Sequence, residues 1–238
     1  RMPPEHLREF SMERLLRTSL LPVGQTMYIW GGGWSEDDAV AGIEAVTLGV
    51  SKQWAEYAAR QTELYDFDKT RYQNHDGLDC SGYIGWLLYN VFHTRNGGTG
   101  YVVGASKMAR ACAMRGWGYL IRNDYCPGDI CSMEGHVWMS LGRCMDGSVL
   151  LVHASPPGVR ICGTYLADGM KSQAVMLAER VMKRKYPAWY ARYPECGVGY
   201  FYLEDSVSMR WYTDEITDPY HLQEMHAESI VHFLYPDL

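Results

Sequence analysis

The spacing of apolar residues changes along this chain, from a helical period in the first half to alternation after Pro127. Near the start, three leucines share one helical face between Ser11, a suitable N-cap, and the helix-ending segment 22–24. Residues 27–30 then read as a short extended piece that enters a run of three glycines. The sequence therefore predicts a helix followed by a short strand and a flexible loop.

Three further segments have helical character. Residues 35–62 begin at Ser35, a possible N-cap, and continue with Ala, Leu and Gln, so they predict a helical insertion. Residues 80–91 predict a helix that stops before the glycines at 97 and 98, and residues 172–186 predict another.

After Pro127 the apolar and polar residues alternate in short runs separated by turn residues. The predicted strands are residues 129–133, 136–141, 149–154, 159–166 and 207–212. Because helices come first and consecutive strands follow, we expect an α+β fold with a central antiparallel sheet.

Composition limits the possible classes of protein. The chain has 238 residues, 47% of them hydrophobic, and a formal net charge of −6. Its longest nearly unbroken apolar stretch, residues 83–92, is shorter than the roughly 20 residues that span a bilayer. Its only basic run is residues 183–185, so nucleic acid is not an expected partner. We also expect no export signal within the given chain, because no charged segment followed by an apolar one opens it.

Seven cysteines cannot all pair within one chain, so at least one is free or is paired with another molecule. None has the C-x-x-C spacing of zinc ribbons or thioredoxin-like sites. We expect most of them to be small buried hydrophobic residues.

Cys80 is the candidate nucleophile. It follows Asp79, a good N-cap, and so stands at the start of a predicted helix, where backbone N–H groups and the helix dipole lower the pKa of a thiol. Gly82 leaves room near the sulfur.

Two histidines provide a candidate base and its orienting partner. Alternation places His136 and His153 on the same face of two successive strands. A four-residue hairpin loop at 143–146 predicts that they lie directly opposite each other, and a tighter turn keeps both on the same face. Two other interpretations remain open: both are ordinary core histidines, or they form a zinc site with Cys80.

These residues lie in motifs that resemble, in order, those of the NlpC-type (NlpC/p-sixty) cell-wall cysteine peptidases, a papain-like group. The resemblance covers about residues 15–34 and 77–166. The motifs are Tyr28-Ile29-Trp30-Gly31-Gly32, Asp79-Cys80-Ser81-Gly82-Tyr83, Pro127-Gly128-Asp129-Ile130, Gly135-His136-Val137 and His153-Ala154-Ser155.

The resemblance implies a papain-like fold in which Cys80 is the nucleophile, His136 the general base and later acid, and His153 the residue that orients His136. It implies that Tyr28, Asp79 and Ser81 form the pocket for the free amino end of a peptidoglycan stem peptide. It further implies hydrolysis of an amide bond next to a γ-D-glutamyl residue, without a metal or other cofactor. The implied location is extracellular or at the cell wall, or delivery by a phage or secretion machine.

The chain also departs from this family. We expect one domain over residues 1–238, with a helical insertion at about 35–77 and a C-terminal extension at about 167–238. Trp138 stands where the family has a small residue, on the face of His136, so we expect it to contact substrate. The alternatives are a cysteine amidase or acyltransferase acting on another small amide or lipid, and an inactive binding module. A stem-peptide enzyme requires an amine pocket that the insertion leaves open beside Cys80.

Overall fold

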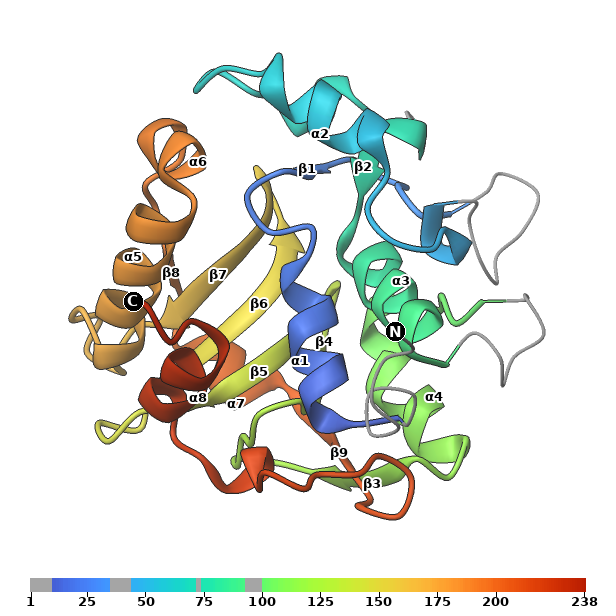
Figure 1. Cartoon of the computed structure of the whole chain (residues 1–238), viewed down its shortest axis with the longest axis vertical. Coiled ribbons are helices and arrows are strands. Elements are labelled where there is room, and N and C mark those ends of the chain that lie inside the picture. The colour runs from blue at the N-terminus through green and yellow to red at the C-terminus, as the bar shows by residue number, and fades with distance from the viewer. Residues whose placement is uncertain (1–9, 35–43, 72–73, 93–99) are drawn as a thin grey trace.

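The computed structural model describes residues 10–34, 44–71, 74–92 and 100–238, which form a mixed α+β structure (Figure 1). Its helices are α1 (Met12–Leu20), α2 (Lys52–Ala59), α3 (Cys80–Phe92), α4 (Met108–Met114), α5 (Gln173–Lys185), α6 (Pro187–Arg192), α7 (Phe201–Asp205) and α8 (Ala227–Leu234). Its strands are β1 (Met27–Tyr28), β2 (Gly77–Leu78), β3 (Gly118–Ile121), β4 (Ile130–Met133), β5 (His136–Arg143), β6 (Val149–Ser155), β7 (Gly158–Thr164), β8 (Gly197–Val198) and β9 (Val207–Trp211).

The strands form one mixed sheet in the order β2-β1-β7-β6-β5-β4-β9-β3, and β8 pairs with β7. The centre, from β4 to β7, is antiparallel and consecutive, while β1 pairs with β2 and β7 pairs with β8 in parallel. The predicted α+β class and the four central strands are therefore confirmed.

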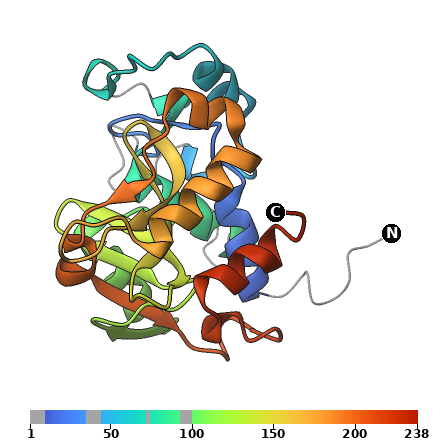
Figure 2. The same cartoon turned by 90° about the vertical axis from the view of Figure 1, so that its left-hand side faces the viewer.

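Alternation along the central strands divides the core into two clusters. Val137 and Met139 of β5 belong to a large cluster that includes residues of α1, α3 and α8. Trp138, between them, belongs to a smaller cluster with Leu151 of β6 and Tyr202 of α7. Figures 1 and 2 show α1, α5 and α8 together on one side of the central strands. The sheet is thus buried on both faces, and its histidines lie on the α7 side by the same alternation.

Three predicted helices are present at nearly the expected positions. The Ser11 hydroxyl accepts a hydrogen bond from the Arg14 backbone N–H and begins α1, and Ser172 begins α5 in the same way by accepting from Val175. The helix predicted over 80–91 is α3. Each start was predictable because N-cap chemistry is local to the sequence.

The prediction of one helix over residues 35–62 is wrong in its described part. Ser35 and its role as a cap lie outside the described residues. Glu44–Val46 forms a short 3-10 turn, Gly49 has a φ of +73°, and α2 starts only after Ser51, whose hydroxyl accepts from the Gln53 backbone N–H. A left-handed residue interrupts an α-helix, so the insertion forms separate short pieces.

Residues 167–238 are not peripheral to the sheet, as an extension would be. They supply β8 beside β7, and β9 pairs with β4 on one side and with β3 on the other. The sequence pattern gave no separate prediction for β3 or α4, which lie between α3 and the central strands along the chain. The C-terminal third is therefore part of the same sheet.

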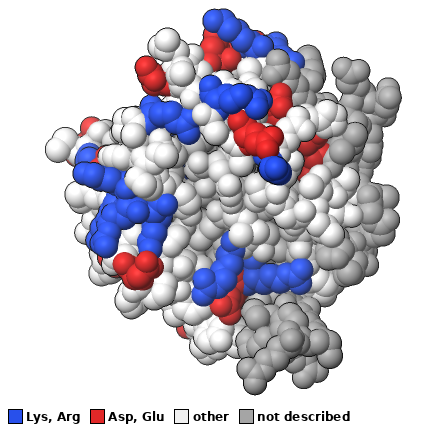
Figure 3. All heavy atoms as spheres, turned by 45° about the horizontal axis from the view of Figure 1, so that its top comes forward, with Lys and Arg blue, Asp and Glu red and all other residues white. Residues whose placement is uncertain are grey.

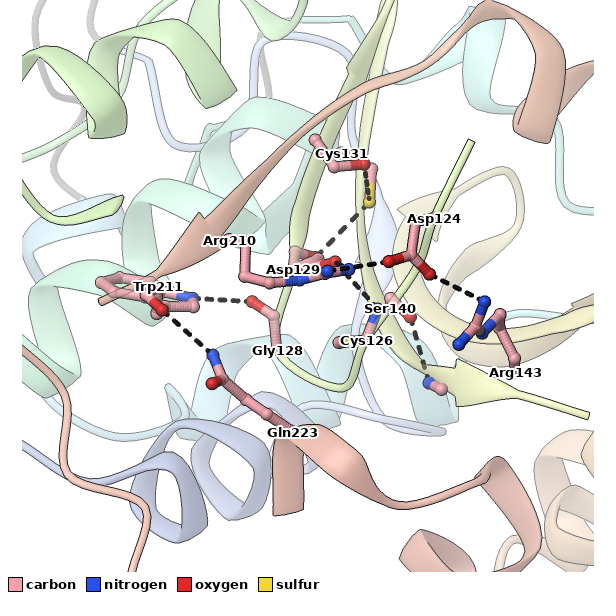
Figure 4. Close-up of polar contacts among 12 residues, drawn as sticks. Asp124, Cys126, Gly128, Asp129, Cys131, Ser140, Arg143, Arg210, Trp211 and Gln223 are labelled. Atoms are coloured by element: carbon pink, nitrogen blue, oxygen red, sulfur yellow. Dashed lines mark hydrogen bonds and ion pairs between the residues drawn. The ribbon is translucent and has the colours of Figure 1, made fainter. Parts of the chain in front are cut away.

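An ion network that is buried at Asp129 and exposed at Arg143 joins β4 to β9 (Figure 4). Asp129 is completely buried and accepts hydrogen bonds from the Arg210 guanidinium at 3.2 and 2.7 Å and from the Cys126 backbone N–H at 2.8 Å. Arg210 also contacts Asp124 at 2.9 Å, and Asp124 contacts Arg143 at 2.8 Å. In this Asp129 network (Asp124, Asp129, Arg143 and Arg210), each charge has an opposite charge as a neighbour.

Over the described ranges, no helix has both the length and the apolar character needed to cross a membrane. On the face shown in Figure 3, Lys and Arg lie in several separate groups, and Asp or Glu lies beside most of them. That face differs from the continuous positive surface typical of nucleic-acid-binding proteins.

Candidate active site

Close backbone packing places the start of α3 against the glycine segment that follows β1. The Asp79 backbone N–H donates to the Gly32 carbonyl oxygen at 2.9 Å, and a Cβ on Gly82 would lie 2.1 Å from the same oxygen. Gly82 is therefore required by the backbone of Gly32, and not only by space near the sulfur as the sequence suggested. Two segments about 50 residues apart thus form one wall of the site.

Asp79 is the N-cap of α3, as predicted. Its Oδ1 accepts hydrogen bonds from the Gly82 backbone N–H at 2.7 Å and from the Ser81 hydroxyl at 3.1 Å. Its backbone carbonyl accepts the first helical bond, from Tyr83. Burial outweighs these bonds and raises the pKa of Asp79 to about 6.

The Cys80 side chain is only 6% exposed, at the first position of α3. Burial, followed by the nearby Asp79 carboxylate, raises the pKa of its thiol to about 12. The backbone N–H groups of Val137, Ser81 and Cys80 itself act in the opposite direction. The lowered thiol pKa expected from a helix N-terminus is therefore absent here, because desolvation and a neighbouring anion exceed the effect of the backbone donors.

His136 and His153 form a hydrogen-bonded pair, with His136 Nε2 2.9 Å from His153 Nδ1. The prediction that they lie directly opposite each other is wrong. Met139 pairs with Val152 and Ser140 with Leu151, so His153 lies opposite Trp138 and diagonal to His136.

The different register has two local causes. Arg143 pairs with Val149, which leaves a five-residue loop in place of the four-residue loop expected, and a bulge lies between Ser140 and Gly142. Because the net shift is two residues, both histidines keep the predicted face, and the ring nitrogens still meet.

Burial favours the neutral forms of both imidazoles. It lowers the pKa of His136 to about 4, and it lowers the pKa of the completely buried His153 well below the usual value, with His136 and Arg160 adding to the effect. Because His136 Nε2 is engaged by His153, Nδ1 is the ring nitrogen of His136 that remains for a reaction partner. Near neutral pH the Cys80 thiol and both imidazoles are thus uncharged.

Tyr202 of α7 is a site residue that the sequence reasoning missed. Its ring lies edge-on to both histidines, with centroids 5.5 Å from His136 and 6.0 Å from His153. Burial raises the pKa of its phenol, and a hydrogen bond with the Ser155 side chain acts against that rise. No motif surrounds Tyr202 in the sequence, and only the path of the chain back over the sheet brings it here.

The residues expected to bind a free amino group lie together, and two of them, Tyr28 and Ser81, are covered, while Asp79 is partly exposed. Tyr28 is 7% exposed and Ser81 is 5% exposed. Phe67 from the insertion packs edge-on against Tyr28, with centroids 5.5 Å apart, and the Trp34 indole donates to the Ser81 hydroxyl at 2.9 Å. Tyr65, also from the insertion, donates to the Tyr28 carbonyl oxygen.

Trp138 does not occupy the position expected of a substrate-binding residue. It is completely buried, its indole donates to the Ser206 hydroxyl at 3.0 Å, and its ring stacks on Tyr125 with centroids 5.4 Å apart. It packs beneath Tyr202, with ring centroids 5.9 Å apart. Trp138 therefore supports the site from within the core.

In the part of the chain that the structure describes, no group of three His, Cys, Asp or Glu residues is arranged to bind a metal ion. All seven cysteines are free thiols, and five of them, including Cys80, are buried. The zinc alternative for Cys80, His136 and His153 has no support from this geometry.

Comparisons of this chain with protein-family models, with curated proteins and with solved structures found no match.

Proposed function

We propose that this protein is a cysteine hydrolase that cleaves an amide bond through an acyl-enzyme, with Cys80 as the nucleophile and His136 as the base. The observation that carries the proposal is the 2.9 Å contact between His136 Nε2 and His153 Nδ1, next to the Val137 N–H that acts on the Cys80 thiol. A nucleophile, a base and a group that orients the base are the parts that such chemistry requires.

The reaction begins from the neutral pair. His136 Nδ1 takes the proton of the Cys80 thiol as the sulfur attacks the substrate carbonyl carbon, and the carbonyl oxygen becomes an oxyanion. Backbone N–H groups at the start of α3, including that of Cys80, stabilise the oxyanion. His136 then protonates the departing amine, and water releases the acyl group with the same residues in reverse roles.

Peptidoglycan stem peptides are the proposed substrate class, and a γ-D-glutamyl–diamino acid bond is the proposed target. This part rests on the ordered motifs that resemble the NlpC-type peptidases and on the papain-like arrangement that they imply. The Asp79 carboxylate, beside Tyr28 and Ser81, has the charge needed to bind a substrate ammonium group. Because Phe67 and Tyr65 of the insertion cover Tyr28, the open amine pocket that this substrate requires forms only if these side chains move away.

A second candidate is an amidase or acyltransferase that uses the same residues on another small amide or lipid. The covering of Tyr28 and Ser81 by Phe67, Tyr65 and Trp34 favours it, because such substrates need no open amine pocket. The third alternative, an inactive binding module, predicts no reactive thiol at Cys80.

Mass spectrometry of purified peptidoglycan fragments tests these candidates. We expect the wild-type protein to release a defined dipeptide, and Cys80→Ala to release none. Cys112→Ala is the matched control, because Cys112 is also a buried free thiol but lies in α4. Phe67→Ala, which uncovers Tyr28, should increase the rate on stem peptides.

Each negative result has a distinct meaning. If all fragments stay intact while an alkylating probe modifies Cys80 rapidly, the stem-peptide assignment is wrong and the second candidate replaces it. Slow alkylation alone is also expected of a buried neutral thiol, so the protein is assigned as an inactive module only if the wild type and Cys80→Ala are, in addition, equally inactive on small amide and ester substrates.

A further inference from the structure

A buried arginine lies beside the histidine pair, on the strand next to His153. Arg160 of β7 is the direct cross-strand partner of His153 of β6, so the two side chains share one face of the sheet. Arg160 is 8% exposed. Its terminal nitrogens donate to the backbone carbonyl oxygens of Glu195 at 2.8 Å and Pro156 at 3.1 Å.

Within the described residues, this guanidinium has no carboxylate partner, in contrast to Arg210, which contacts two. Backbone carbonyl oxygens satisfy hydrogen bonds but carry no net charge. Glu63, Glu179 and Glu195 line the same pocket as Arg160, yet among the described residues none of their carboxylates forms an ion pair with it. Arg160 Nε and His153 Nε2 are also both buried without a hydrogen-bond partner in the described structure. An uncompensated buried charge is costly, and its presence requires an explanation.

The chemistry of the histidine pair explains why a positive charge is kept beside it. Two hydrogen-bonded imidazoles have similar intrinsic proton affinities, so once His136 has taken a proton from Cys80, a proton could pass to His153 through their shared hydrogen bond. The proton that passes is the one on His136 Nε2, so His136 would keep its Nδ1 proton but become a neutral imidazole, which is a far weaker acid toward the leaving amine. A fixed positive charge next to His153 removes that alternative, because two like charges in a buried site repel strongly.

We propose that Arg160 is a positioning residue that keeps His153 neutral, so that the positive charge stays on His136 after it takes the thiol proton. The inference rests on the proposed function, since it assigns a role within the same site. Arg160 itself touches no reacting atom.

The other groups around His153 do not supply a compensating negative charge. His136 faces His153 from β5, and Tyr202 faces it from α7. The pKa of His153 is lowered by burial, by His136 and by Arg160. Cys80 at the start of α3 and Cys162 of β7 both lie near Tyr202. Burial raises the pKa of both thiols, so neither carries a negative charge near neutral pH.

The Glu195 carboxylate does not neutralise the positive charge of Arg160. Glu195 offers Arg160 its backbone carbonyl oxygen, while its carboxylate accepts from Tyr165 and from the Gly197 N–H.

The test is an NMR titration of the histidine side chains in the whole chain, which reports protonation without relying on catalysis. In the wild-type protein we expect His153 to remain neutral from pH 8 to pH 5, whatever form His136 takes. In Arg160→Met we expect the proton affinity of His153 to rise about tenfold or more, because the neighbouring cation is gone. Arg160→Lys, which keeps the charge, should restore the wild-type titration.

Two outcomes would overturn the proposal: protonation of His153 in the wild-type protein above pH 6, or a folded Arg160→Met variant with an unchanged titration of His153. If Arg160→Met does not fold, Arg160→Gln takes its place in the titration, because glutamine removes the charge but keeps an N–H donor for the backbone carbonyl oxygens. Failure of peptide cleavage, with these titrations as expected, would reject the proposed substrate and leave the role of Arg160 standing.

Discussion

Two buried polar clusters lie in the same sheet and differ in how fully their groups are paired. In the Asp129 network, both carboxylates contact arginines, and Asp129 also accepts a backbone N–H. In the candidate site, His153 Nε2 and Arg160 Nε have no partner among the described residues, and the thiol of Cys80 is buried near a carboxylate that disfavours its ionisation.

The difference separates a stabilising role from a chemical one. A network whose charges are all paired joins strands and resists change, because breaking the Asp129–Arg210 contact leaves a buried charge alone. A cluster with unpaired atoms and neutral acid and base groups contributes little to stability, but its protons can move when a substrate arrives. We therefore expect substitutions in the two clusters to affect different properties.

The largest expected effect is on the rate of reaction. His136→Ala should reduce turnover by about 10³-fold, since the proposed general base is lost, and should change the free energy of unfolding by less than about 2 kcal/mol. Steady-state kinetics and chemical denaturation measure the two quantities. His226→Ala, at an exposed histidine outside the site, should change neither; a similar loss of turnover in both variants would contradict the assignment of His136.

The next largest effect is on stability. Asp129→Asn should lower the free energy of unfolding by about 3 to 5 kcal/mol, because Arg210 loses its buried charged partner. Turnover per folded molecule should be unchanged. Glu13→Gln is the control for a solvent-accessible pair and should cost about 0.5 kcal/mol or less, since Glu13 pairs with Arg17 at i,i+4 on the surface of α1. Equal losses in both variants would remove the distinction between the clusters.

A third expectation concerns pH. The pKa of Asp79 is raised to about 6 in the folded protein, so the folded state holds this proton more tightly than the unfolded state, in which the pKa of an aspartate is near 3.8. The resulting stabilisation is fully present below pH 3.8 and is lost as the pH rises through about 6. The loss amounts to about 3 kcal/mol from one group.

Asp79→Asn isolates this contribution, because asparagine keeps the N-cap acceptor but does not titrate. Denaturation at several pH values should show a wild-type curve that falls relative to the variant between pH 4 and pH 7. Parallel curves would mean that Asp79 has an ordinary pKa in the folded protein.

The smallest expected effect tests the position of Trp138. Trp138→Phe removes the indole N–H donor to the buried Ser206 hydroxyl and should cost about 1 to 2 kcal/mol of stability. Turnover should change only a few-fold if Trp138 supports the histidines from within the core. A loss of about 10²-fold in turnover at constant stability would return Trp138 to the substrate-binding role that its place in the sequence suggested.

Features encoded within a few residues were predictable. The caps at Ser11, Asp79 and Ser172 and the alternation of β4 to β7 each depend on neighbouring positions, and all are present. The shared face of His136 and His153 follows from the same alternation.

Features that depend on distant segments were not predictable. The bulge at Gly142 and the length of the following loop set the register, and neither has a distinct sequence pattern. Tyr202 reaches the histidines only because the chain returns across the sheet after β7. The pKa of Cys80 likewise depends on burial, which the helix N-terminus alone does not reveal.

The position of β9 between β4 and β3 has a consequence for synthesis on the ribosome. Cys80, His136 and His153 are all translated before Tyr202, whose ring packs against both histidines. They are also translated before β9, which pairs with β4 and β3. At about 5 to 20 residues per second, the roughly 60 residues from His153 to the end of β9 take about 3 to 12 s to emerge. During that interval the nascent chain exposes the edge of β4 and leaves the histidine pair without its aromatic neighbour, so the site is completed only after translation has passed β9.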